Sequence, residues 1–183
     1  MIARLLDRVP ELVLSTSATT RPPRPGERDG VDYHFVDEDD FDALAAAGKF
    51  LEHASYSGHR YGTPRSEVEP RLAEGTSVVL EIEVQGARQI RETLPEAVQV
   101  FIAPPSPEVP RERLEGRATD RPEAIERRLA AASEELTARE EFGHVIVNDD
   151  VERAASELGQ LVHAKLAEAA GEGDSKRAEK GLM

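Results

Sequence analysis

The chain has 183 residues, and 36 acidic against 23 basic side chains give it a formal net charge of −13. This balance argues against a duplex nucleic-acid binder, which usually shows a basic face, although a few clustered arginines still permit a local site for a small anion. Cysteine is absent, which excludes disulfides and thiolate metal sites. No apolar run is long enough for a membrane span or a signal peptide, so we expect a cytoplasmic protein.

Hydrophobic periodicity predicts helices and strands that alternate along the chain. Helices are expected at residues 2–8, 38–47, 64–74, 88–93, 107–115, 122–139 and 151–166, and strands at 11–17, 33–36, 50–56, 78–82, 98–102 and 145–147. The alternation indicates one α/β domain over residues 1–168, with a largely parallel sheet covered by helices on both faces. Residues 32–66 break the alternation and are expected to form an inserted lobe. Residues 169–183 have little to bury and are expected to be a disordered tail.

The loop after the first expected strand carries a candidate phosphate site. Arg21 and Arg24 lie three residues apart in a segment that also holds three prolines. Guanidinium groups match phosphate geometry, and proline rigidity lowers the cost of ordering the loop. The alternative is a solvated basic loop with no ligand.

Candidate partners for a purine base follow along the chain. Glu52 can accept both N–H donors of a guanine edge, and the hydroxyls of Ser17 and Thr63 can satisfy what remains; the loss of such partners in a buried site enforces base choice. Tyr33 and Tyr61 can donate their hydroxyls to phosphate oxygens. Each of these residues, taken singly, is also compatible with ordinary surface or core.

Two further segments carry charge where α/β enzymes place their chemistry. Glu81 and Glu83 follow a buried strand, where a carboxylate can contact a base or organise Mg²⁺; the alternative is a merely charged strand end. Arg113 and Arg117 flank a glycine between two expected helices, and Arg128 follows. Such arginines can neutralise a phosphoryl group during transfer, although helix surfaces often carry them without a function. The five histidines lack metal-ligand spacing, so no protein metal site is expected.

Together these stretches resemble the guanylate kinase family. The motifs that carry the resemblance are S-x-T-T-R-x-P-R-x-G-E at 17–27, Y-x-F-V at 33–36, a strand-end Glu at 52, Y-G-T at 61–63, L-E-I-E-V-Q-G at 80–86, F-I-A-P-P-S at 101–106, R-L-E-G-R-A-T at 113–119, R-R-L at 127–129 and V-N at 147–148. They occur in the family's order and spacing, and the resemblance covers about residues 1–166.

The resemblance implies a P-loop-kinase-like fold that transfers a phosphoryl group from ATP, with Mg²⁺, to GMP. It also implies the following roles: Arg21, Arg24, Tyr33 and Tyr61 hold the GMP phosphate; Ser17, Glu52, Thr63 and Glu81 read guanine; Glu83 lies near the metal and phosphates; Arg113, Arg117 and Arg128, in and after an Arg-rich lid at about 113–123, clamp the ATP phosphates; and Asn148 lies near adenine.

One part of the family pattern is missing from the sequence. Guanylate kinases open with a strand and G-x-x-G-x-G-K-[ST], whose backbone N–H groups and Lys hold the ATP phosphates. No such motif occurs in these 183 residues. The neighbours of that strand would lose ladder partners, and the chain as given is expected to have little activity. Glu83 for the family's aspartate and Ala118 for its lid glycine are milder departures.

Three explanations fit this pattern, in order of preference. A start codon placed too late would hide the P-loop of an active kinase, because a GTG valine codon can be read as an initiating Met. A genuine P-loop-less chain would bind GMP without transferring phosphate. A protein-interaction module, like the guanylate-kinase-like domains of membrane-associated scaffolds, is the third, and retention of Glu52 and Tyr61 disfavours it.

Overall fold

The computed structural model describes residues 1–106 and 136–180, with side chains to residue 171. Its strands form two parallel pairs and one four-stranded sheet. The parallel pairs are β1 (Leu12–Leu14) with β6 (Ser77–Val79) and β7 (Val100–Ala103) with β8 (His144–Val147). The four-stranded sheet has the order β3-β2-β5-β4 and comprises β2 (Ala18–Thr19), β3 (His34–Phe35), β4 (Phe50–Tyr56) and β5 (His59–Pro64).

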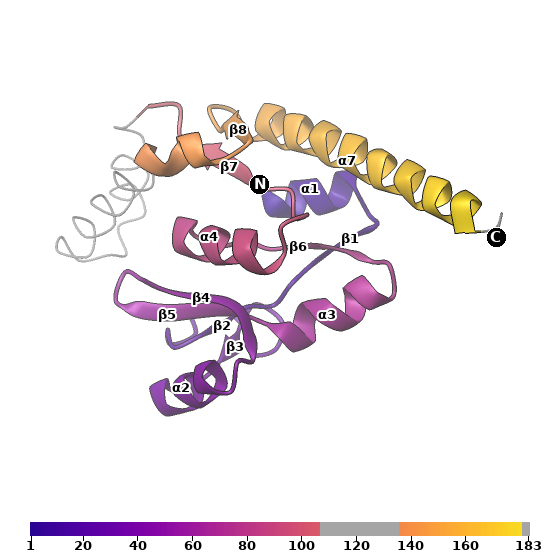
Figure 1. Ribbon diagram of the computed structural model, residues 1–183. Coiled ribbons are helices and arrows are strands. Elements are labelled where there is room, and N and C mark those ends of the chain that lie inside the picture. Colours follow the sequence, from indigo (N-terminus) through magenta and orange to yellow (C-terminus); the bar gives the residue numbers. More distant parts are fainter. Residues whose placement is uncertain (107–135, 181–183) are drawn as a thin grey trace.

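The helices form layers around these strands (Figure 1). α1 (Ile2–Arg8) and α7 (Val151–Lys180) lie side by side on one side of the parallel pairs. On the other side, α3 (Arg65–Ala73) and α4 (Val84–Thr93) lie between the parallel pairs and the four-stranded sheet. α2 (Glu38–Ala46) packs beyond that sheet, and a short 3₁₀ helix, Ala138–Glu141, precedes β8.

β6 separates two apolar cores. Val79 packs against the cluster of Leu5, Val9 and Leu158 from the α1 and α7 layer, whereas Val78 packs against the cluster that contains Ile90 of α4. Successive side chains of a strand point to opposite faces, so each face of β6 is covered by its own helix layer. This matches the predicted parallel sheet with helices on both faces.

The four-stranded sheet, together with α2, forms the lobe. Asp37 caps α2 by accepting a hydrogen bond from Asp40 N at 2.8 Å. Phe41 of α2 is fully buried and stacks on Phe50 of β4, with ring centroids 4.7 Å apart, and the Arg60 guanidinium lies 4.3 Å from the Phe41 ring centre. The lobe therefore has a small core of its own, distinct from the two core clusters around β6.

Several predicted boundaries are wrong. No strand was predicted between residue 56 and the helix expected at 64–74, but His59–Pro64 forms β5, the partner of both β2 and β4. The strand predicted at 11–17 pairs only over Leu12–Leu14, with Ser77–Val79 of β6. α4 begins at Val84 rather than 88. β2 joins the lobe sheet although it lies outside the predicted range 32–66.

The chain end also differs from the prediction. α7 continues to Lys180, whereas residues 169–183 were expected to be a disordered tail. The Ala, Glu, Lys and Arg residues of this segment have high helix propensity, which the burial argument overlooked, whereas Gly171 and Gly173 oppose the helix. No helix in the described part of the chain combines the length and apolar character that a membrane crossing requires.

Candidate functional site

The centre of the candidate site is a buried carboxylate on the lobe sheet. Glu52 of β4 lies directly opposite Thr63 of β5 in the antiparallel ladder, so their side chains share one face. The Thr63 hydroxyl donates a 2.6 Å hydrogen bond to Glu52 Oε1. Glu52 is 4% exposed and Thr63 is fully buried. Both residues were predicted to read guanine, and the structure brings them together.

The surroundings of Glu52 disfavour its charged form. Burial raises the pKa of Glu52, and hydrogen bonds from the Thr63 hydroxyl and backbone oppose the rise. An ionised carboxylate in this place needs further donors. An N–H-rich ligand edge would supply them.

Aromatic side chains extend the same face away from Glu52. Tyr61 lies two residues before Thr63 on β5, about 7 Å along the strand, and therefore points to the same side. The Tyr33 and Tyr61 rings meet edge to face with centroids 6.1 Å apart. The Arg21 guanidinium lies 5.3 Å from the centre of the Tyr33 ring. The structure thus gathers Arg21, Tyr33 and Tyr61, three of the four residues predicted to hold a phosphate.

Arg21 is held in place by a partner that the sequence prediction did not include among the site residues. Its two terminal nitrogens donate to the two oxygens of Glu27, each at 2.9 Å. The Glu27 hydrogen bond is the main cause of the raised pKa of Arg21, and the same contact, with the Arg24 backbone N–H, lowers the pKa of Glu27. Glu27 closes the quoted arginine-loop motif, so the signal was present in the sequence.

Thr19 is a second residue that the prediction omitted. Its side chain is fully buried, donates to the Arg60 carbonyl at 2.9 Å and accepts from Arg21 N at 3.1 Å. These bonds tie the start of the arginine loop to β5. Thr19 is also part of the quoted motif, and its role is to hold the loop backbone.

The remaining predicted residues of the GMP set have the following local contacts. Ser17 directly precedes β2, and its carbonyl accepts from His34 N at 2.9 Å. Arg24 is exposed, and its backbone N–H donates to Glu27 at 2.6 Å. Glu81 is exposed, and its charge helps to raise the pKa of Tyr33, a rise whose main cause is burial. Glu83 occupies the N-cap position of α4.

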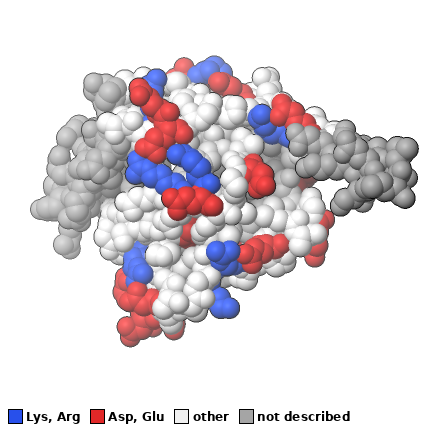
Figure 2. Space-filling view, in the orientation of Figure 1, with Lys and Arg blue, Asp and Glu red and all other residues white. Residues whose placement is uncertain are grey.

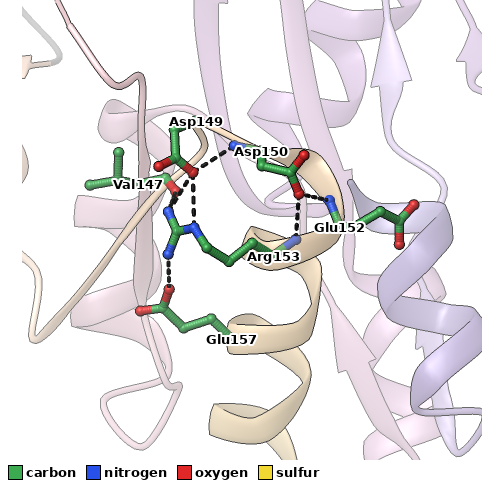
Figure 3. A network of polar contacts seen from close by, with 6 residues as sticks. All are labelled: Val147, Asp149, Asp150, Glu152, Arg153 and Glu157. Atoms are coloured by element: carbon green, nitrogen blue, oxygen red, sulfur yellow. Dashed lines mark hydrogen bonds and ion pairs between the residues drawn. The ribbon is translucent and has the colours of Figure 1, made fainter.

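A charged network joins Val147, Asp149 and Arg153, on both sides of Asn148 in the sequence (Figure 3). The Asn148 N–H donates to the Ala103 carbonyl at 2.7 Å, which links the ends of β7 and β8. Arg153 donates to the Val147 carbonyl at 2.9 Å and also binds Asp149. Asp150 caps α7 through the N–H groups of residues 152 and 153. The chain is therefore fixed on both sides of Asn148.

The remaining predicted residues cannot be placed in this way. Arg113, Arg117, Arg128 and the predicted lid at 113–123 lie outside the described residues.

On the side drawn in Figure 2, basic side chains of the described residues lie beside acidic ones. Examples among the described residues are the ion pairs of Arg153 with Asp149 and Arg88 with Glu141. Within residues 1–106 and 136–171, no group of three or more His, Asp or Glu side chains is arranged to hold a metal ion.

Comparison with known proteins gives a consistent result. A protein-family model described as guanylate kinase matches residues 1–165. A guanylate kinase of Frankia casuarinae is 53% identical over 162 residues, covering 88% of each chain. One from Synechococcus sp. is 54% identical over 158 residues, covering 86% of this chain and 83% of the relative. The crystal structure of guanylate kinase from Anaplasma phagocytophilum matches with a TM-score of 0.73 and 36% identity, covering 89% of this chain and 81% of that one.

Proposed function

This chain belongs to the guanylate kinase family, and we propose from that premise that its lobe sheet binds GMP as the phosphoryl acceptor. The family is an ATP:GMP phosphotransferase family, so the expected products are ADP and GDP. The observation that carries the proposal is the buried pair of Glu52 and Thr63, at one end of a face whose other end holds Arg21, Tyr33 and Tyr61.

The chemistry of this face suits the two ends of GMP. The ionised Glu52 carboxylate accepts from the N1–H and 2-amino groups of guanine, which supply the donors that its buried position lacks. Arg21 is a charged donor for the phosphate, and the hydroxyls of Tyr33 and Tyr61 are further donors. Glu27 keeps the guanidinium of Arg21 in one orientation before the ligand arrives, which reduces the ordering cost of binding.

The protein's contribution to transfer is position and charge rather than covalent chemistry. GMP held at both ends presents a phosphate oxygen in a fixed direction for in-line attack on the γ-phosphate of ATP. We assign Asn148 to the adenine side and Arg113, Arg117 and Arg128 to the transferring phosphates, on the family resemblance. Mg²⁺ would accompany ATP and offset the charge of its phosphates, and Glu83 is the carboxylate that we assign to hold it.

We further propose that the 183-residue chain binds GMP but transfers phosphate poorly, because it contains no P-loop motif to hold the ATP phosphates. Titration calorimetry with GMP tests the first half, with AMP as the control ligand that offers no N1–H. A coupled ATP/GMP assay that detects ADP tests the second half. Heat with GMP, no heat with AMP and little turnover are expected. A folded chain that gives no heat with GMP contradicts the proposal and favours an interaction module.

A further inference from the structure

One glycine of α4 lies against the buried carboxylate of the site. A Cβ atom built on Gly86 would lie 2.2 Å from Glu52 Oε2 and 2.9 Å from Glu52 Cδ. All three of the nearest atoms that it would meet belong to Glu52. The Glu52 carboxylate therefore occupies the space that a side chain at position 86 would fill.

The backbone does not explain why a glycine stands there. Gly86 is the third residue of α4 and is absent from the positive-φ glycines of the described chain, which are Gly26, Gly30, Gly48, Gly58 and Gly75. In a helix, alanine is more favourable than glycine. The close approach of Glu52 is the remaining structural reason for a glycine at this position.

A second residue of α4 fixes the strand that carries Glu52. Gln89, one helical turn after Gly86, accepts from His53 N at 3.1 Å through its carbonyl oxygen and donates to His53 O at 2.8 Å through its amide nitrogen. β4 is the edge strand of its sheet, so the amide of Gln89 takes the place of a neighbouring strand at this residue. These two hydrogen bonds hold the backbone of His53, the residue after Glu52. They therefore fix the position of β4 relative to α4 next to Glu52.

We propose that Gly86 and Gln89 are positioning residues for guanine recognition: the side-chain amide of Gln89 anchors β4 at His53, and the missing side chain of Gly86 admits the Glu52 carboxylate against α4. The inference rests on the proposed binding of GMP. Glu52 is a flexible side chain, so a methyl group at position 86 turns its carboxylate aside without disturbing the backbone. Selectivity for guanine is then lost while the fold remains.

Gly86→Ala is the variant that tests this inference, and Gly159→Ala is its matched control. Gly159 also lies in a helix, α7, but a Cβ there would meet its nearest atom, Arg8 Cδ, at an ordinary 3.6 Å. Calorimetry on the full chain measures the affinity for GMP and for IMP, which lacks the 2-amino group. We expect Gly86→Ala to weaken the affinity for GMP roughly 10- to 100-fold and the affinity for IMP by less. The preference for GMP over IMP, given by the ratio of the two affinities, should therefore decrease. Gly159→Ala should leave both affinities unchanged.

Gln89→Leu, of similar volume but without the amide, should narrow the same ratio. Glu52→Asp shortens the side chain by one methylene and withdraws the carboxylate from position 86. The loss of GMP affinity in the double variant Gly86→Ala/Glu52→Asp should therefore be smaller than the sum of the losses in the two single variants. If Gly86→Ala fails to fold, a cooperative melting transition in Gly86→Ala/Glu52→Ala supports the competition for space between the two side chains, and its absence overturns that competition. If the wild-type chain binds GMP and Gly86→Ala has the same GMP affinity and the same GMP/IMP affinity ratio, this inference alone is overturned. A wild-type chain that binds no GMP overturns the proposed function and the inference with it.

Discussion

Replacing Glu52 by Gln should weaken GMP binding without lowering the stability of the free protein at pH 8. Gln keeps one carbonyl oxygen, which can still accept from Thr63 as Glu52 Oε1 does at 2.6 Å. Its amide then presents N–H donors where the guanine edge also presents donors. Hydrogen bonds to charged groups contribute about 1.5–3 kcal/mol each, so losing one of them weakens GMP binding by about 2–3 kcal/mol, or roughly 30- to 150-fold in Kd.

Without a ligand, the same substitution should not lower the stability of the protein at neutral or higher pH. Because burial raises the pKa of Glu52 above its unfolded value, the folded chain binds an extra proton between those two pKa values. The stability of the wild-type chain therefore falls as the pH rises through that window, whereas the Gln variant has no such loss. Glu52→Gln should be at least as stable as wild type at pH 8 and should lose that advantage at acid pH.

Calorimetry with GMP and urea unfolding at two pH values measure both effects. Glu69→Gln is the control, since Glu69 is an exposed residue of α3 whose ion pair with Arg65 is solvated. A Glu52→Gln variant that binds GMP within threefold of wild type would refute the reasoning. So would a variant that is clearly less stable than wild type at pH 8.

Three further predictions follow from the described contacts. Because guanine needs the ionised carboxylate, guanosine binding at a pH near the raised pKa of Glu52 should release a proton. Calorimetry in buffers of different ionisation enthalpy detects this proton release. Equal proton release from Glu52→Gln would contradict the prediction. Arg21 lowers the pKa of Glu27, so the stability from this pair is present at pH 7 and lost as the pH falls through the lowered value. Glu27→Gln should therefore cost stability in urea at pH 7 but not near pH 2, and an equal cost at both would contradict the pairing. Phe41→Ala, at a fully buried ring, should cost about 3–5 kcal/mol in urea unfolding, and a loss below about 1 kcal/mol would contradict the lobe core.

The sequence predicted the fold best where periodicity and end signals agree. The range of β4 was predicted as Phe50–Tyr56, and α2 begins after the Asp37 cap as expected. β5 was missed because its residues, His59–Pro64, are polar and glycine-containing and show no apolar alternation. Its strand conformation comes from ladder bonds to β2 and β4, which a local pattern does not report.

The candidate site was predicted as residue types rather than as an arrangement. Motif spacing identified Glu52, Thr63 and Arg21, and the structure brings the first two into direct contact. Glu27 stands in the quoted motif at 17–27, but its bond to Arg21 was not predicted, because a carboxylate in a polar loop is ordinary. The close approach of Gly86 to Glu52 joins residues 34 positions apart, and only the packing of α4 on β4 reveals it.

A crystal structure of the chain soaked with GMP tests the central claim most directly. Guanine N1 and the 2-amino nitrogen should lie within hydrogen-bond distance of the Glu52 carboxylate, and the phosphate should contact Arg21 together with the hydroxyls of Tyr33 and Tyr61. GMP bound on another face, or bound here with its base turned away from Glu52, would contradict the account.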